Sequence, residues 1–386
     1  MPMNRRSFLR NAAIAPVAAK HLWRRSADAA SSRLLFIGTR TDKSSKGIYA
    51  CHWNPANGEL TSLGLAAETP DPTFLTLHPS RQYLYAANEL STWNGKPTGT
   101  VSAFRIDHSA ARLHLLDQVT AEGTGTCNVN TTHTGHAVFC ANYNGGSSTS
   151  FQVRANGAIS APVSHFQYYG HGPNLARQAS PHAHRVTPSP DDHYLFVNDL
   201  GLDRIHIYHL DAATAQLAPA RPNHWQAFPG SGPRALRFHP NGHVAYVVFE
   251  MGSAVQTLHW DRHKGTFHAM QPPISLTPDD YNGPRRGCDI VLDRKVRFAY
   301  VANRDYNCMV TFSVAPDGKL TLLRRSHCGG KIPRHLTLDP TERWLLVANE
   351  ASDTVSVFAR DPETGKLEDM PAHQHPISIP QCLVFA

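Results

Sequence analysis

Seven ionisable side chains stand at repeated positions in segments that are otherwise apolar. They comprise guanidinium groups, carboxylates and one imidazole. Guanidinium groups bind carboxylates and phosphates through paired N–H donors, and an imidazole titrates near neutral pH and can move a proton. The combination predicts a site that binds an anion and transfers a proton, and the alternative is a set of structural salt bridges between repeats. The seven residues are His184, Arg234, Glu250, Arg304, Arg334, Glu89 and Glu350.

A constant spacing relates these residues to pairs of short apolar segments. The residue that starts the first segment lies fifteen positions before the end of the second, as in Thr73 and Asn88. If each pair forms an antiparallel hairpin, its start and its end lie at the same edge. If the hairpins surround a central channel, the starting residues should form a ring at one mouth of that channel. The residues that follow each second segment should form another ring beside it. The spacing recurs at Cys127–Asn142, His184–Asp199, Arg234–Phe249, Cys288–Asn303 and Arg334–Asn349.

The repeated unit contains four short strands and recurs about every 50 residues, which is typical of a propeller blade. Six copies of the inner hairpin are complete. Residues 34–39 resemble a second strand without its first, and residues 379–385 a first strand without its second. Pairing these two ends would complete a seventh blade and remove an exposed strand edge. The sequence predicts an all-β, seven-bladed β-propeller with four-stranded antiparallel blades, closed by its terminal strands.

The N-terminal segment has a different character from the rest of the chain. Residues 4–10, Asn-Arg-Arg-Ser-Phe-Leu-Arg, resemble a twin-arginine export signal, followed by a short apolar stretch. We expect residues 1–30 to be a leader and residues 31–386 to form a single propeller domain. The expected location is periplasmic or secreted, with the twin-arginine export machinery as a partner.

Charge and hydropathy exclude two classes of partner. The 386 residues carry a net charge of +7, and residues 1–30, with six Lys or Arg and one Asp, account for +5 of it. The remaining +2 is too weak for a nucleic-acid-binding surface. No apolar run approaches the roughly 20 residues of a membrane span, so neither nucleic acid nor a membrane span is expected.

A histidine pair stands at the start of the third of these hairpins. His182 and His184 are separated by one residue, so on a strand both imidazoles lie on one face. They could form half of a metal site, but no third ligand stands at a suitable spacing. We expect no metal ion and no cofactor, a catalytic role for His184, and substrate contacts from His182, Arg334, Glu350 and Glu89.

Several stretches resemble the lactonase family of seven-bladed propellers, which includes propeller-type 6-phosphogluconolactonases and carboxymuconate lactonizing enzymes. The resemblance covers residues 34–386. In the lactonizing relatives, the active site is assigned to a His, a Glu and two Arg, which correspond by motif to His184, Glu250, Arg234 and Arg304. The stretches are 37–39, 46–49, 170–174, 181–184, 232–234, 238–242, 332–335 and 379–382.

The resemblance implies a lactone hydrolase that acts on a sugar-acid lactone. Arg234 and Arg304 would hold the anionic part of the substrate and the developing oxyanion. His184 would be the general base or proton shuttle, and Glu250 would orient His184 or water or serve as an acid; the choice of base stays open. No Gly-x-Ser-x-Gly motif is present, which favours direct attack by water. The alternatives are a carboxymuconate-type cycloisomerase and a non-catalytic propeller that serves as a binding platform.

Overall fold

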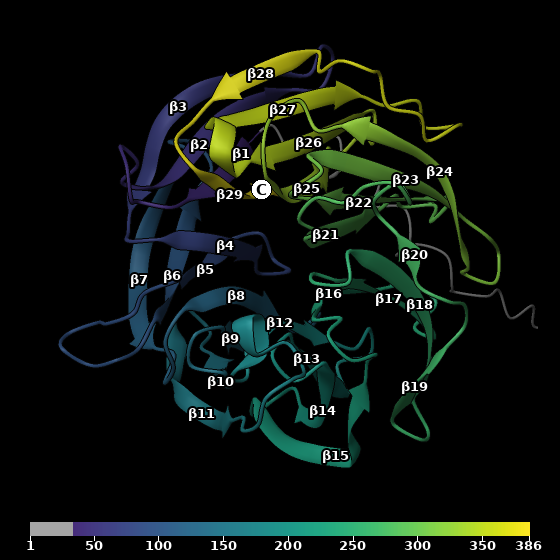
Figure 1. Ribbon diagram of the computed structural model, residues 1–386. Coiled ribbons are helices and arrows are strands. Elements are labelled where there is room, and N and C mark those ends of the chain that lie inside the picture. The colour runs from purple at the N-terminus through teal and green to yellow at the C-terminus, as the bar shows by residue number, and fades with distance from the viewer. Residues whose placement is uncertain (1–33) are drawn as a thin grey trace, which may run out of the picture.

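The computed structural model describes residues 34–386, which form seven antiparallel sheets arranged in a ring (Figure 1). Each sheet has a path of four strands, so the predicted seven-bladed β-propeller is confirmed. The predicted leader, residues 1–30, lies outside the described residues, and the boundary at residue 31 stays a prediction. Within residues 34–386, no helix is long and apolar enough to cross a membrane.

The blades follow one another along the chain, each beginning with its innermost strand. The blade that joins the chain ends contains β29 (Pro380–Phe385), β1 (Leu34–Thr39), β2 (Gly47–Asn54) and β3 (Glu59–Glu68). The next three contain β4 (Pro72–Leu77), β5 (Tyr83–Asn88), β6 (Thr100–Asp107) and β7 (Arg112–Thr120); β8 (Thr126–Thr131), β9 (Ala137–Asn142), β10 (Ser147–Val153) and β11 (Ile159–Gln167); and β12 (Ala183–Pro188), β13 (Tyr194–Asp199), β14 (Arg204–Asp211) and β15 (Gln216–Gln226).

The last three blades repeat the pattern, with one short strand added. They contain β16 (Pro233–Phe238), β17 (Val244–Phe249), β18 (Ala254–Asp261) and β19 (Thr266–Ala269) with β20 (Ile274–Ser275); β21 (Gly287–Leu292), β22 (Phe298–Asn303), β23 (Cys308–Val314) and β24 (Leu320–His327); and β25 (Pro333–Leu338), β26 (Trp344–Asn349), β27 (Thr354–Ala359) and β28 (His373–Pro376). Within residues 34–386 the helical segments are α2 (Leu175–Gln178) and the 3₁₀ turn η1 (Glu350–Ser352).

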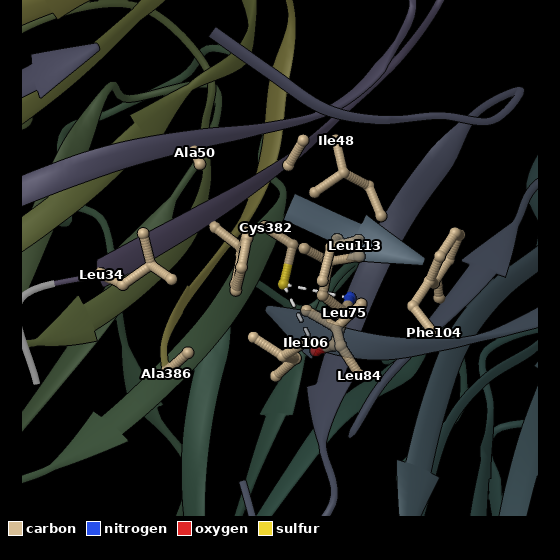
Figure 2. Packing of buried hydrophobic residues seen from close by; sticks show 13 residues of the cluster. Leu34, Ile48, Ala50, Leu75, Leu84, Phe104, Ile106, Leu113, Cys382 and Ala386 are labelled. Carbon is tan, nitrogen blue, oxygen red and sulfur yellow. Dashed lines mark hydrogen bonds between the residues drawn. The ribbon is translucent and has the colours of Figure 1, made fainter. Parts of the chain in front are cut away.

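The ring closes between the two ends of the described chain. Strand β29 pairs with β1 in antiparallel register, which places Leu383 opposite Ile37. This blade packs against the β4–β7 blade through a buried apolar cluster, in which the Cys382 thiol contacts the backbone of Leu75 (Figure 2). Burying each large apolar side chain contributes about 1.5–3 kcal/mol, so the closure is held by packing as well as by strand pairing.

Tyrosine hydroxyls on the second strands tie neighbouring blades together. Tyr85 donates a hydrogen bond to the carbonyl of Gly157 at 3.1 Å, and Tyr300 donates to Gly365 at 2.7 Å. Each glycine lies in the outer turn of the following blade. Gly157 has φ +83°, and a Cβ there would lie 2.3 Å from the ring of Tyr83. Glycine is therefore required both by the backbone conformation and by the packing.

Each innermost strand contains a β-bulge near its start. In β12, Ala183 pairs with Asp199 and Arg185 with Asn198, so the residue between them has no partner in the ladder. We expected the ring residues to be the first of each strand, but they are the second, because the bulge adds one residue in every blade. A bulge re-aims the extra side chain. The bulged residues are Thr73, Cys127, His184, Arg234, Arg334 and Gln381, and in β21 the irregularity spans Cys288 and Asp289.

Candidate active site

The bulged residues of six blades meet at the end of the channel where the innermost strands begin, here called the upper mouth. They line a narrow neck, a cavity of about 10 Å³, which is close to the space of one water molecule. His184 is buried in this neck together with Arg234. The bulged members of the neck are Thr73, Cys127, His184, Arg234, Arg334 and Gln381.

A repeated backbone hydrogen bond holds the second ring beside the first. The residue after each second strand donates its N–H to the carbonyl of the residue that directly precedes the innermost strand of the same blade. In this way Glu250 binds Gly232 at 2.7 Å, and Arg304 binds Arg286 at 2.9 Å. The same bond forms in all seven blades, so the predicted equivalence of the ring positions corresponds to a real register. The donors are Arg40, Glu89, Tyr143, Leu200, Glu250, Arg304 and Glu350.

The Glu250 carboxylate is the centre of the charged cluster. Its Oε2 lies 3.1 Å from Nε of Arg234 and 2.5 Å from Nη2 of Arg304. Its Oε1 accepts a hydrogen bond from Nη2 of Arg177 at 2.6 Å. Three guanidinium groups thus share one carboxylate, and the surplus of positive charge suits an anionic ligand. Arg234 is also fixed by a 2.7 Å hydrogen bond from Nη1 to the carbonyl of Cys288.

The arginines keep Glu250 ionised. Burial alone would raise the pKa of Glu250, but the positive charges of Arg304 and Arg234 outweigh it and hold the pKa well below its ordinary value. A carboxylate with so low a pKa, and with both oxygens occupied, is a poor proton acceptor. The geometry therefore suits Glu250 for orienting the guanidinium groups.

His184 is also held in its deprotonated form, which for an imidazole is neutral. Burial, together with the positive charge of Arg234, lowers the pKa of His184 well below its ordinary value, so the imidazole is neutral at neutral pH. Its Nδ1 lies 4.0 Å from the thiol of Cys127, whose pKa is raised to about 12 by burial. Within residues 34–386, Nε2 has no hydrogen-bond partner. A neutral imidazole with a free Nε2 can accept a proton from water.

The other expected substrate contacts lie around this centre. His182 stacks on the ring of Tyr143 with centroids 4.5 Å apart, and its Nδ1 lies 3.0 Å from the Tyr143 carbonyl oxygen. Arg334 lines the neck and faces Glu350 across 3.9 Å, a loose ion pair. Glu89 instead forms a 2.7 Å ion pair with Arg40 and so ties the closing blade to its neighbour. Both His182 and Glu89 are thus occupied by partners outside the central cluster.

Arg177 was not among the residues singled out from the sequence. It comes from the short helix α2, in the long connection between β11 and β12. The neighbouring Gln178 anchors α2 by donating hydrogen bonds to the carbonyl of Leu200 at 2.8 Å and to Asp203 at 2.9 Å. The Arg177 side chain is 38% exposed, which makes it the most accessible of the three guanidinium groups bound to Glu250. The length of this connection was the one available signal, because it lies outside the repeat.

The site contains no arrangement of typical metal ligands. Across the described part of the chain, no group of three or more His, Cys, Asp or Glu side chains is placed to hold a metal ion. His182 and His184 lie on the same strand end, but His182 is engaged with Tyr143.

Known proteins share both the sequence pattern and the fold. The family described as Lactonase, 7-bladed beta-propeller, matches residues 34–385. A 6-phosphogluconolactonase of Bacillus subtilis is 32% identical over 91% of this chain and 97% of its own, and one of Formosa agariphila is 31% identical over 87% and 95%. The solved structure of a periplasmic gluconolactonase from Pseudomonas aeruginosa is 31% identical, with a TM-score of 0.85 over 91% of this chain and 98% of that one. The chain belongs to the lactonase family of seven-bladed β-propellers.

Proposed function

We propose that the protein hydrolyses the lactone of a sugar acid at the upper mouth. The observation that carries this proposal is the Glu250 carboxylate shared by three arginines beside a buried, neutral histidine. Lactone hydrolysis needs a base for water and a positive environment for the oxyanion. The product is a carboxylate, which suits the surplus of guanidinium groups. The relatives named 6-phosphogluconolactonase and gluconolactonase support the same reaction class.

The reaction follows from the protonation states of the side chains. Water attacks the lactone carbonyl carbon while Nε2 of His184 takes a proton from it. The carbonyl oxygen becomes an oxyanion that is stabilised by the guanidinium groups held on Glu250. The ring C–O bond then breaks, and the imidazolium returns its proton to the leaving alkoxide. The proton that His184 took from water is thus transferred to the alkoxide, and the product is an open-chain hydroxy acid.

The activity is tested by base uptake at constant pH. We expect gluconolactone to be opened faster than its spontaneous hydrolysis, with a lower rate for Arg234→Ala. Turnover of carboxymuconate and not of sugar lactones would instead identify a cycloisomerase. Equal rates for the wild type and for variants of the central cluster would contradict catalysis and favour a binding platform. Comparing kcat/KM for the phosphorylated and unphosphorylated lactones decides which is the better substrate.

Arg177 is proposed to bind the substrate at the open side of the cluster. One N–H of its guanidinium donates to Oε1 of Glu250, and the side chain is partly exposed. Further N–H donors are therefore available to bind a substrate. A hydrogen bond to a charged group contributes about 1.5–3 kcal/mol. We expect Arg177→Ala to lower kcat/KM by about 10- to 100-fold, mainly through KM. The matched control is Arg154→Ala, which removes an exposed arginine paired with Asp117 and should leave the kinetics unchanged; an unchanged KM in Arg177→Ala would contradict the assignment.

Export to the periplasm or the medium is a further part of the proposal. The paired Arg5 and Arg6 with Phe8 support it, as does the periplasmic relative. An exported enzyme would meet unphosphorylated sugar lactones, which favours an aldonolactone as the substrate. Replacing both arginines by lysine should retain the protein in the cytoplasmic fraction. Equal periplasmic amounts of the variant and the wild type would argue against twin-arginine export.

A further inference from the structure

The channel opens at its other end into a second cavity that the proposed reaction does not use. This lower cavity measures about 390 Å³ and lies where β4, β16, β21, β25 and β29 end. Its volume falls within the roughly 300–1,000 Å³ of small-molecule sites. The ionisable residues of its lining are Arg81, Arg185, Arg237, Arg294, Asp289, His335, Asp339 and Glu342.

The neck separates the lower cavity from the upper mouth. Phe74 and Arg185 line both the neck and the lower cavity. Because the neck has a volume of only about 10 Å³, an organic ligand cannot pass through it. A ligand of the lower cavity must therefore be recognised by the residues of that cavity.

Asp289 engages two of the basic side chains in the lower cavity. Its Oδ1 accepts a hydrogen bond from Nη2 of Arg185 at 2.8 Å, and its Oδ2 lies 3.5 Å from Nε2 of His335. Burial raises the pKa of Asp289, but the charge of Arg185 outweighs it and brings the pKa to about 2. Burial lowers the pKa of His335 to about 4, so His335 is neutral. The charge of Asp289 is thus matched by Arg185.

Arg237 lies within electrostatic reach of Asp289 but is not in contact with it. It lies on β16, is exposed to the cavity, and forms neither an ion pair nor a hydrogen bond with any residue of 34–386. On the same wall, Nε of Arg185 is buried and has no hydrogen-bond partner. The Asp289 carboxylate acts on Arg237 only through its charge and is already hydrogen-bonded to Arg185, so a bound anion would give Arg237 a partner in direct contact.

We propose that the lower cavity binds a small oxyanion, a carboxylate or phosphate group, through the guanidinium of Arg237. The planar fork of an arginine matches both groups in a bidentate manner. Arg185 and Asp289 form the wall beside it. The site is distinct from the upper mouth, because it uses different residues on the other side of the neck.

The test measures thermal stabilisation of the full chain by inorganic phosphate and by malonate at constant ionic strength. A ligand that binds the folded state raises its stability with concentration. We expect at least one of the two anions to stabilise the wild type. In Arg237→Gln, the apparent affinity for that anion should fall at least about tenfold, because losing a hydrogen bond to a charged group weakens binding by about that factor. Arg105→Gln removes an exposed arginine outside the cavity and should respond as the wild type does. Arg237→Lys should retain part of the response.

The outcomes separate the lower cavity from the upper mouth. Gluconolactone hydrolysis should be unchanged in Arg237→Gln, because Arg237 takes no part in the proposed reaction. An equal response in wild type and Arg237→Gln, or no response of the wild type to either anion, would overturn the proposal. A response to phosphate alone assigns the site to phosphate-bearing ligands, and a response to malonate alone assigns it to carboxylates.

Discussion

Replacing His184 by alanine is expected to lower kcat for lactone opening by about 10²- to 10⁴-fold, the usual contribution of a positioned general base. The imidazole is buried and neutral, and its Nε2 is free within the described residues. Glu250 cannot replace it, because both of its oxygens are held by arginines. The measurement is the initial rate of base uptake with saturating gluconolactone.

His182→Ala is the matched control for this loss. The two imidazoles are separated by one residue, but His182 stacks on Tyr143 and its Nδ1 contacts the Tyr143 carbonyl. Its removal should act mainly on KM and should lower kcat much less. If the two alanine variants lost kcat equally, or if His184→Ala kept the wild-type kcat, the assignment of His184 as the base would be wrong.

The pH profile provides an independent check on the same residue. Because burial and Arg234 lower the pKa of His184 below its ordinary value of 6.5, the free base persists into mildly acidic solution. The acid limb of kcat/KM, corrected for spontaneous hydrolysis, should therefore lie below pH 6.5. The limb should be absent from the residual activity of His184→Ala. A limb above pH 6.5 would indicate a different base.

The repeat made the fold and much of the site predictable. The constant spacing alone aligned His184, Arg234 and Arg334, because equivalent hairpins place equivalent residues at one edge. The β-bulge was not visible in this spacing, since it adds the same extra residue to each hairpin and leaves the interval constant. The sequence therefore predicted the correct residues at the mouth and placed them one position too early in their strands.

Residues outside the repeat could not be placed in the same way. Arg177 lies in the irregular connection that carries α2, and no periodic argument reaches it. The ion pairs between residues of the two rings could not be predicted either, because they depend on the direction in which side chains from different blades point. Glu89 shares its ring position with Glu250, yet it pairs with Arg40, whereas Glu250 binds arginines of the central cluster.

Replacing Glu250 by glutamine is expected to affect stability and catalysis together. The amide has nearly the same shape, so the main change is the loss of a negative charge from a cluster of three guanidinium groups. Removing one partner of a buried ion pair costs about 3–5 kcal/mol, because the remaining charge stays buried without compensation. We expect a loss of this size in the free energy of unfolding by urea, and a fall in kcat/KM as the guanidinium groups lose their orientation.

The dependence on pH distinguishes this explanation from a simple packing defect. The pKa of Glu250 in the folded protein is held below its ordinary value of 4.5 by Arg304 and Arg234, against the opposing effect of burial. The stability contributed by its charge is therefore fully present above pH 4.5 and is lost as the pH falls toward the pKa of the folded state. The difference in unfolding free energy between wild type and Glu250→Gln should be constant at neutral pH and should shrink in acid. If the loss of stability came from a packing defect, the difference in unfolding free energy would not change with pH. In that case Glu250→Asp, which keeps the charge, would be as unstable as Glu250→Gln.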